Sequence, residues 1–258
     1  MKKKLLIVVS LVLAVAAIVT ASVMGTIAYM TSASKVSNVF TVGDVFITLD
    51  ESAVKPNGTL VENGGRTDKN SYHLMPGDTY IKDPAITVRA DTEICYLFLV
   101  TRNQITSIEA NADGAHTDTP TMAEQMYENG WAIYKDTTVG SRIWVYCGTK
   151  DNIDGRYDAE NPTAQYYTPM AVCGADVTPS DTSKVFQASA DPNVRIPIFQ
   201  NFTITSNNQI DIKPYSGAEV TINAVAIQAS SEFGALCSHE AIDDAWAAVI
   251  AQYPYIQD

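Results

Sequence analysis

The chain has 258 residues, 17 basic and 29 acidic side chains, and a formal net charge of −12 at neutral pH. This acidic balance argues against nucleic acids and anionic membranes as ligands, because both repel a negatively charged surface. Hydrophobic residues make up 46% of the chain, which is enough for a packed core.

The first 28 residues have the pattern of a secretory signal peptide. The three lysines Lys2, Lys3 and Lys4 precede an apolar run over residues 5–24, and a small-residue site follows that ends at Ala28. Because a signal peptidase cuts after such a site, we expect cleavage between Ala28 and Tyr29 and a secreted mature chain. The alternative is a retained anchor, since about twenty apolar residues are enough to span a bilayer. Cleavage leaves 14 basic and 29 acidic side chains, a net charge of −15.

The segment that follows predicts an extended strand over residues 39–49. It begins with Val39 and Phe40, and alternation then places Val45, Ile47 and Leu49 on one face of the strand. The opposite face carries Asp44, Phe46 and Thr48. We therefore expect one face of this strand to be buried.

Further strands are predicted by short runs of β-branched and aromatic residues between turn residues. They cover residues 85–89, 93–101, 131–135, 142–148, 166–173, 194–204 and 219–228. The run over 93–101 is almost continuously apolar, which is typical of a strand buried on both faces. We expect residues 29–258 to form one mainly β domain, a jelly-roll-like antiparallel β-sandwich.

Two helices interrupt the strand pattern. Residues 121–129 predict a short internal helix that ends at Gly130. A C-terminal helix is predicted between the N-cap residue Ser238 and Pro254. Its apolar residues recur at helical spacing, so we expect this face to pack on the core. They are Ile242, Trp246, Val249, Ile250 and Tyr253.

The four cysteines are far apart in the sequence and include no C-x-x-C pair, so zinc-ribbon and thioredoxin motifs have no support. They are Cys95, Cys147, Cys173 and Cys237. Disulfides are permitted outside the cell, and four cysteines allow three pairings. The alternative is that the cysteines are buried free thiols that act as small hydrophobic residues.

Two pairs of motifs carry a family resemblance. The first pair is Gly25-Thr26-Ile27-Ala28-Tyr29 followed by Asn38-Val39-Phe40-Thr41-Val42-Gly43, and the second is Pro76-Gly77-Asp78 followed by Lys82-Asp83-Pro84. Together they resemble the TasA/camelysin family of Gram-positive bacteria, and shorter likenesses occur at residues 196–199, 226–229 and 245–246. The resemblance implies a jelly roll, cleavage by the signal peptidase SipW, and a role as a subunit of an extracellular fibre or biofilm matrix.

The resemblance also implies a route of assembly, in which an N-terminal segment leaves its own body and completes a neighbour's sheet. Because such a head-to-tail contact does not close, it grows filaments. We expect residues 29–49 to be the assembly element, with Val39, Phe40, Val45, Ile47 and Leu49 as its strand residues. The expected partners are other copies of the chain and, during export, SipW. The membrane is a partner only through the signal peptide before cleavage.

The sequence offers little support for a catalytic motif. Camelysin is described as a metalloendopeptidase, and such an enzyme places two histidines at i and i+4 with a glutamate beside the first. Here His239 and Glu240 are followed by Asp243 where the second histidine is required. We therefore expect no catalytic residues, no metal and no cofactor.

Three alternatives remain open from the sequence. A camelysin-like secreted metallopeptidase and a monomeric cell-surface adhesin or binding module are the two other functions. A weak calcium site is the third, in the acidic cluster of Asp151, Asp154, Asp158 and Glu160.

Overall fold

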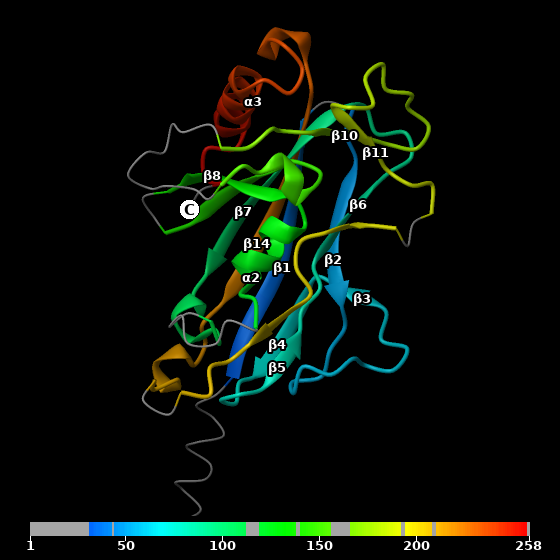
Figure 1. The fold of residues 1–258 in the computed structure, drawn as a ribbon. Coiled ribbons are helices and arrows are strands. Elements are labelled where there is room, and N and C mark those ends of the chain that lie inside the picture. The colour runs from blue at the N-terminus through cyan, green and yellow to red at the C-terminus, as the bar shows by residue number, and fades with distance from the viewer. Residues whose placement is uncertain are drawn as a thin grey trace, which may run out of the picture.

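A computed structural model describes residues 31–42, 44–111, 119–137, 140–155, 166–191, 194–207 and 210–256. This part of the chain is mainly β, as predicted, with fourteen strands and two α-helices (Figure 1). The predicted signal peptide, the cleavage site at Ala28 and Tyr29, and residue 43 lie outside the described residues. None of the described helices is both long and apolar enough to cross a membrane.

The largest sheet has eight strands. They are β1 (Thr31–Val42), β4 (Lys69–His73), β7 (Cys95–Asn103), β8 (Trp131–Asp136), β9 (Arg142–Tyr146), β10 (Ala171–Cys173), β11 (Val185–Gln187) and β14 (Val220–Gln228). Their order is β11-β10-β7-β14-β1-β4, and β9 pairs with both β7 and β8. The pairs β1–β14 and β10–β11 are parallel, whereas the others in this sheet are antiparallel.

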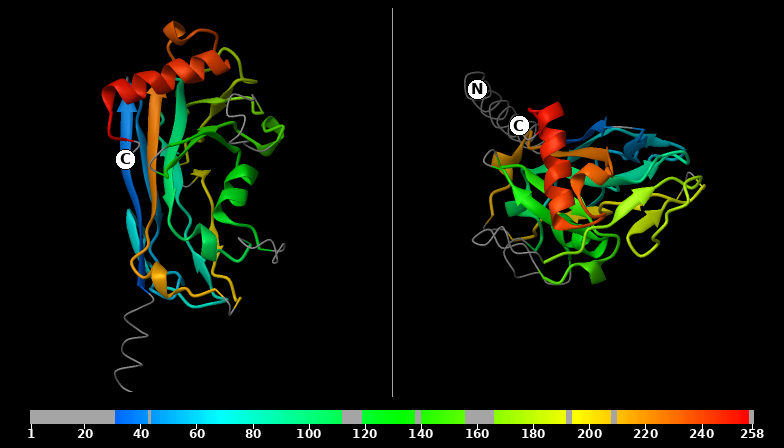
Figure 2. Two further views of the ribbon diagram at one scale, coloured as in Figure 1. Left: turned by 90° about the vertical axis from the view of Figure 1, so that its left-hand side faces the viewer. Right: turned by 90° about the horizontal axis from the view of Figure 1, so that it is seen from above.

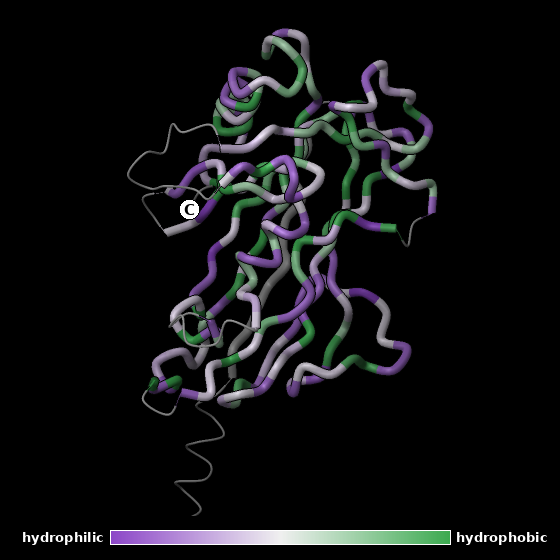
Figure 3. Tube along the Cα trace, viewed as in Figure 1, coloured by the Kyte–Doolittle hydropathy of each residue, from purple (hydrophilic) through white to green (hydrophobic). Residues whose placement is uncertain are grey.

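Two smaller sheets complete the described β-structure. One contains β2 (Ile47–Ser52), β3 (Arg66–Thr67), β6 (Ala85–Val88) and β12 (Ile196–Pro197), in the order β12-β6-β2-β3. The other pairs β5 (Thr79–Ile81) with β13 (Asn201–Thr203). Hydrophobic residues concentrate along the strands, and the peripheral loops carry many of the hydrophilic ones (Figure 3).

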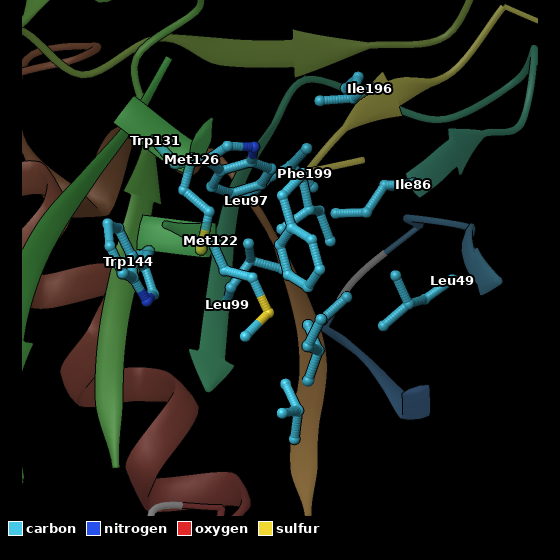
Figure 4. Packing of buried hydrophobic residues seen from close by; sticks show 14 of the residues in the cluster. Leu49, Ile86, Leu97, Leu99, Met122, Met126, Trp131, Trp144, Ile196 and Phe199 are labelled. Atoms are coloured by element: carbon cyan, nitrogen blue, oxygen red, sulfur yellow. The ribbon is translucent and has the colours of Figure 1, made fainter. Parts of the chain in front are cut away.

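The main sheet is buried on both faces. On one face, Leu97 and Leu99 of β7 join a core that includes Ile47 of β2 and Met122 of α2 (Met122–Glu128), with neighbouring core residues shown in Figure 4. On the other face, Phe98 of β7 packs against α3 (His239–Gln252). The prediction that residues 93–101 contain a strand buried on both faces is therefore confirmed.

Both predicted helices are present, and their caps explain where they begin. The Thr121 hydroxyl and the Glu124 carboxylate form a capping box at the start of α2. Ser238 Oγ accepts a 3.0 Å hydrogen bond from the backbone N–H of Ala241 at the start of α3. α3 lies across the main sheet (Figure 2), and its Trp246 ring lies 5.1 Å from that of Phe98. The apolar face of this helix packs on the core, as predicted.

The predicted single strand over residues 39–49 is wrong in one respect, because the structure divides it between two sheets. β1 ends at Val42, and β2 begins at Ile47. The connecting segment forms hydrogen bonds with residues 89–93 instead of with the main sheet. The carbonyl of Asp44 accepts a hydrogen bond from the backbone N–H of Glu93, and the carbonyl of Phe46 accepts one from the backbone N–H of Arg89. The chain thereby leaves the main sheet and enters the second one.

Other predicted strands are shorter than expected. The run over 166–173 contains only β10 and an isolated bridge between Tyr167 and Ile153. The run over 194–204 is split into β12 and β13, because side chains bind its central carbonyls in place of a neighbouring strand. Trp131 Nε1 donates to Pro197 O at 2.9 Å, and Asn129 Nδ2 donates to Ile198 O at 3.0 Å.

The four cysteines, all within described residues, are free thiols in the structure. Cys95, Cys147 and Cys173 are buried, and Cys237 is half-buried. Burial raises the pKa of the Cys95 and Cys147 thiols well above the ordinary value, so these two thiols are poor nucleophiles.

Candidate assembly site around the N-terminal strand

β1 is held between two other strands of the main sheet. Its first part, Thr31 to Lys35, pairs antiparallel with β4, and Thr31 lies opposite His73. From Lys35 to Val42 it runs parallel to β14. β1 therefore occupies a slot whose two flanks come from segments far apart in the sequence (Figure 1).

The register between β1 and β14 brings two predicted assembly residues into the slot. Val39 is paired with Ala224 and Phe40 with Val225, whereas Val36 is paired with Ile222. The register shifts between Val36 and Val39, so the bulged part of β1 lies beside Asn223.

Asn223 of β14, beside the bulge of β1, has a polar side-chain atom without a partner among the described residues. Its Oδ1 atom is buried and has no hydrogen-bond partner. Leaving such an atom unpaired costs about 1–3 kcal/mol. This cost falls on the side chain of Asn223 and leaves the backbone register of β1 and β14 unchanged.

The other three predicted assembly residues lie outside the slot. Val45, Ile47 and Leu49 have exposed fractions of 0%, 7% and 8% and belong to the core beneath the main sheet. Ile47 is paired with Val88 and Leu49 with Ile86, both in β6. The predicted alternation is confirmed, since Asp44, Phe46 and Thr48 are exposed. However, in this structure the buried face stabilises the domain that carries it.

Of the two strands that flank the slot, the sequence predicted one and missed the other. β14 falls within a predicted strand, but β4 was missed because its sequence, Lys69-Asn70-Ser71-Tyr72-His73, is polar and has little β-branched character. Alternation offered a signal, since Asn70, Tyr72 and Leu74 are buried at every second position. The sequence contained no local signal for the parallel pairing of β1 with β14, because the residues of a strand do not specify which other strand pairs with it.

A second candidate site is a pocket of about 640 Å³ between the main sheet and α2. Its apolar wall includes Met122, Trp144 and Phe199, which are labelled in Figure 4. The polar lining includes Glu109 and Arg142, whose guanidinium is paired with Asp136 at 2.6 Å. Apolar walls with a few fixed polar groups are typical of a small-ligand site.

Glu109 is the most perturbed acid of this pocket. Burial raises its pKa to about 7, although hydrogen bonds from Met122 N–H (2.8 Å) and Asn103 Nδ2 (2.6 Å) oppose the shift. Near neutral pH the carboxyl group is thus present in both protonation states. Glu109 is therefore the acid in this pocket whose charge changes near neutral pH.

The residues considered for a metallopeptidase have separate contacts. The His239 ring lies 4.9 Å from that of Tyr167, whereas Asp243 accepts a 2.8 Å hydrogen bond from Tyr134. Among the described residues, no group of three or more His, Cys, Asp or Glu side chains is arranged to hold a metal ion. In the acidic cluster, Asp158 and Glu160 lie outside the described residues.

The fold and the slot define a mainly β protein with an N-terminal strand inserted between two flanking strands of its largest sheet. No protein-family model matches this chain, and neither a curated protein nor a solved structure matches it.

Proposed function

We propose that this chain is a secreted structural subunit of an extracellular fibre or biofilm matrix, and that subunits join by donating β1. The observation that supports the proposal is the place of β1, a complete N-terminal strand inserted between β4 and β14. The TasA/camelysin resemblance of the sequence agrees with this function. The proposed architecture is a jelly-roll-like sandwich, in which the main sheet faces the sheet of β2 and β6.

Donation follows from the physics of strand pairing. Backbone hydrogen bonds recognise any strand of suitable length, and side chains fill the positions that alternate along it. A neighbour's β1 makes the same contacts with β4 and β14 as the chain's own β1, so exchange loses little pairing energy. Since the donor and acceptor surfaces differ, each added subunit leaves one of each free, and a filament grows.

The donated element in this proposal is β1 alone. Ile47 and Leu49 pair with β6 within their own chain, so the acceptor body begins at the connection that contains Asp44. This narrows the segment expected from the sequence, residues 29–49, to Thr31–Val42.

Electron microscopy of the secreted protein tests the proposal, with a variant that lacks residues 31–42 as comparison. We expect filaments from the complete chain and none from the shortened one. A synthetic peptide with the sequence of residues 31–42 should bind the shortened chain at a ratio of one peptide to one chain and keep it monomeric. A peptide with the same residues in scrambled order should not bind. A complete chain that stays monomeric at high concentration would refute the proposal.

The pocket favours one other candidate function, a monomeric cell-surface binding module. The residues that support this function are Glu109 and the apolar wall of Met122, Trp144 and Phe199. Binding of a small ligand that is lost in Trp144→Ala, by a chain that forms no filaments, is the result that would favour this function. The metallopeptidase has no comparable group of ligands among the described residues.

A further inference from the structure

A lysine, a glutamate and an asparagine meet in the buried interior, away from the pocket, and the asparagine lies on β4, one flank of the slot. Glu51 lies in β2, Asn70 in β4, and Lys82 directly after β5. Lys82 Nζ lies 2.8 Å from Glu51 Oε2, and Asn70 Nδ2 donates to Glu51 Oε1 at 2.9 Å. One carboxylate thus holds an amine and a carboxamide on its two oxygens. The side chains of Glu51 and Lys82 have no exposed surface, and Asn70 is 6% exposed.

The carboxamide of Asn70 is fixed in orientation. Besides its bond to Glu51, its Nδ2 donates to the carbonyl of Ser52 at 2.8 Å. Its Oδ1 accepts from the backbone N–H of Val54 at 3.0 Å. A donor at this oxygen polarises the carbonyl and is placed to stabilise negative charge on it, as an oxyanion hole does.

The amine of Lys82 is in an environment that favours its neutral form. Burial lowers the pKa of Lys82, and the attraction of Glu51 only partly offsets the effect. A neutral amine is a nucleophile, whereas an ammonium group is not. Proton transfer from Lys82 to Glu51 gives an uncharged pair in which the amine nitrogen has a lone pair for attack.

We propose that Lys82 and Asn70 form an intramolecular amide bond, with Glu51 as the residue that transfers the protons. Nζ gives a proton to Glu51 and attacks Cγ of Asn70, and the negative charge on Oδ1 is stabilised by Val54 N–H. The Cγ–Nδ2 bond then breaks as Glu51 gives this proton to Nδ2 and ammonia leaves, and Glu51 takes the second proton that Nζ loses when it becomes an amide nitrogen. An amine and a primary amide become a secondary amide and ammonia, so no oxidant or cofactor is needed.

A purely ionic role explains these contacts less well. A buried ion pair contributes little net stability, because the cost of removing both charges from water offsets their attraction. It also does not require a carboxamide fixed by Val54 and Ser52 on the other carboxylate oxygen. The amide bond leaves no charge on the lysine and ties β4 to the segment that follows β5. The inference stands on these contacts and does not depend on fibre assembly.

Trypsin and mass spectrometry on the folded, purified chain test the inference. Trypsin cuts after lysine and arginine, so an unlinked chain gives a peptide from Asn70 to Lys82. In a linked chain Lys82 is not cleaved, and the peptide extends from Asn70 to Arg89 and is lighter by one ammonia. An unmodified Asn70–Lys82 peptide from most of the folded protein would overturn the inference. Loss of ammonia with Lys82 still cleaved would also overturn it, because that indicates a succinimide at Asn70-Ser71.

Variants separate the chemistry from folding. Lys82→Arg removes the nucleophile, and Glu51→Gln removes the proton carrier, so both should keep the ammonia and give no linked peptide. Glu128→Gln is the matched control, because Glu128 is also paired with a lysine, Lys150, at 2.7 Å, but this pair is exposed and has no part in the triad. This control should link like the original chain. A Glu51→Gln chain that links equally well would show that Glu51 has no role, and if that variant does not fold, the result of Lys82→Arg decides.

Discussion

Ile47 offers a direct test of whether the residues that follow β1 belong to the domain that carries them. Ile47 is 7% exposed, is paired with Val88, and packs in the core beneath the main sheet. Ile47→Asp is therefore expected to destabilise the monomer itself. A strand donated as far as Leu49 predicts the opposite, a stable monomer that fails to assemble.

The expected loss can be worked out in two parts. Removing the isoleucine side chain from the core forfeits about 1.5–3 kcal/mol of burial. Burial raises the pKa of a carboxyl group by up to about 3–5 units, and each unit costs about 1.4 kcal/mol when the group is neutral in the fold and ionised in the unfolded chain. When the carboxyl group is fully buried and stays neutral at pH 7, the two parts sum to about 6–7 kcal/mol. Because domains are stable by about 5–15 kcal/mol, most of the stability is lost.

Urea unfolding followed by circular dichroism measures this loss, with Thr48→Asp as the control. Thr48 is the next residue of β2 but is exposed, so the same charge there should cost less than about 1 kcal/mol. A carboxyl group whose folded pKa is raised destabilises least at low pH, so the gap between the variants should narrow from pH 7 to pH 4. Equal stability of the two variants at pH 7 would refute the burial of Ile47.

Three further predictions concern other parts of the chain. Burial raises the pKa of Glu109 to about 7, so its stabilising contribution is complete below about pH 4.5 and is lost as the pH rises through 7. In urea unfolding, the stability of the original chain relative to Glu109→Gln should therefore fall by about 3 kcal/mol between pH 4 and pH 8. Trp246→Ala should cost about 3–5 kcal/mol in the same assay, because Trp246 is 4% exposed and packs on Phe98, and an unchanged midpoint would contradict that packing. N-terminal sequencing of secreted protein should begin at Tyr29, and a start at Met1 would contradict cleavage after Ala28.

The sequence predicted the elements whose signals are local. The capping residues and apolar spacing of α3 lie within the helix itself, and the continuous apolar run of β7 reflects burial on both faces. The alternation of Ile47 and Leu49 likewise reports which side of β2 faces the core. In each case the residues that identify the element in the sequence are the same residues that pack it against the core.

The sequence did not predict which strands pair. Residues 39–49 have the composition of one strand, and only the hydrogen bonds of Asp44 and Phe46 to the segment around Arg89 show that the chain changes sheets there. The triad of Glu51, Asn70 and Lys82 was missed for the same reason. Lys82 stands in the motif that resembles the TasA/camelysin family, but its partners lie on other strands, and no spacing links the three residues.

The amide bond and the slot meet at β4, and this gives a final prediction. In the described part of the sheet β4 is an edge strand that pairs with β1 alone, so tension on a donated β1 would act on β4 directly. A bond from Asn70 to Lys82 anchors β4 to the body. A cross-link that closes a loop of about 15 residues adds about 3 kcal/mol. We therefore expect Lys82→Arg to form filaments that dissolve at lower denaturant concentration than those of the original chain, and equal resistance would show that β4 needs no anchor.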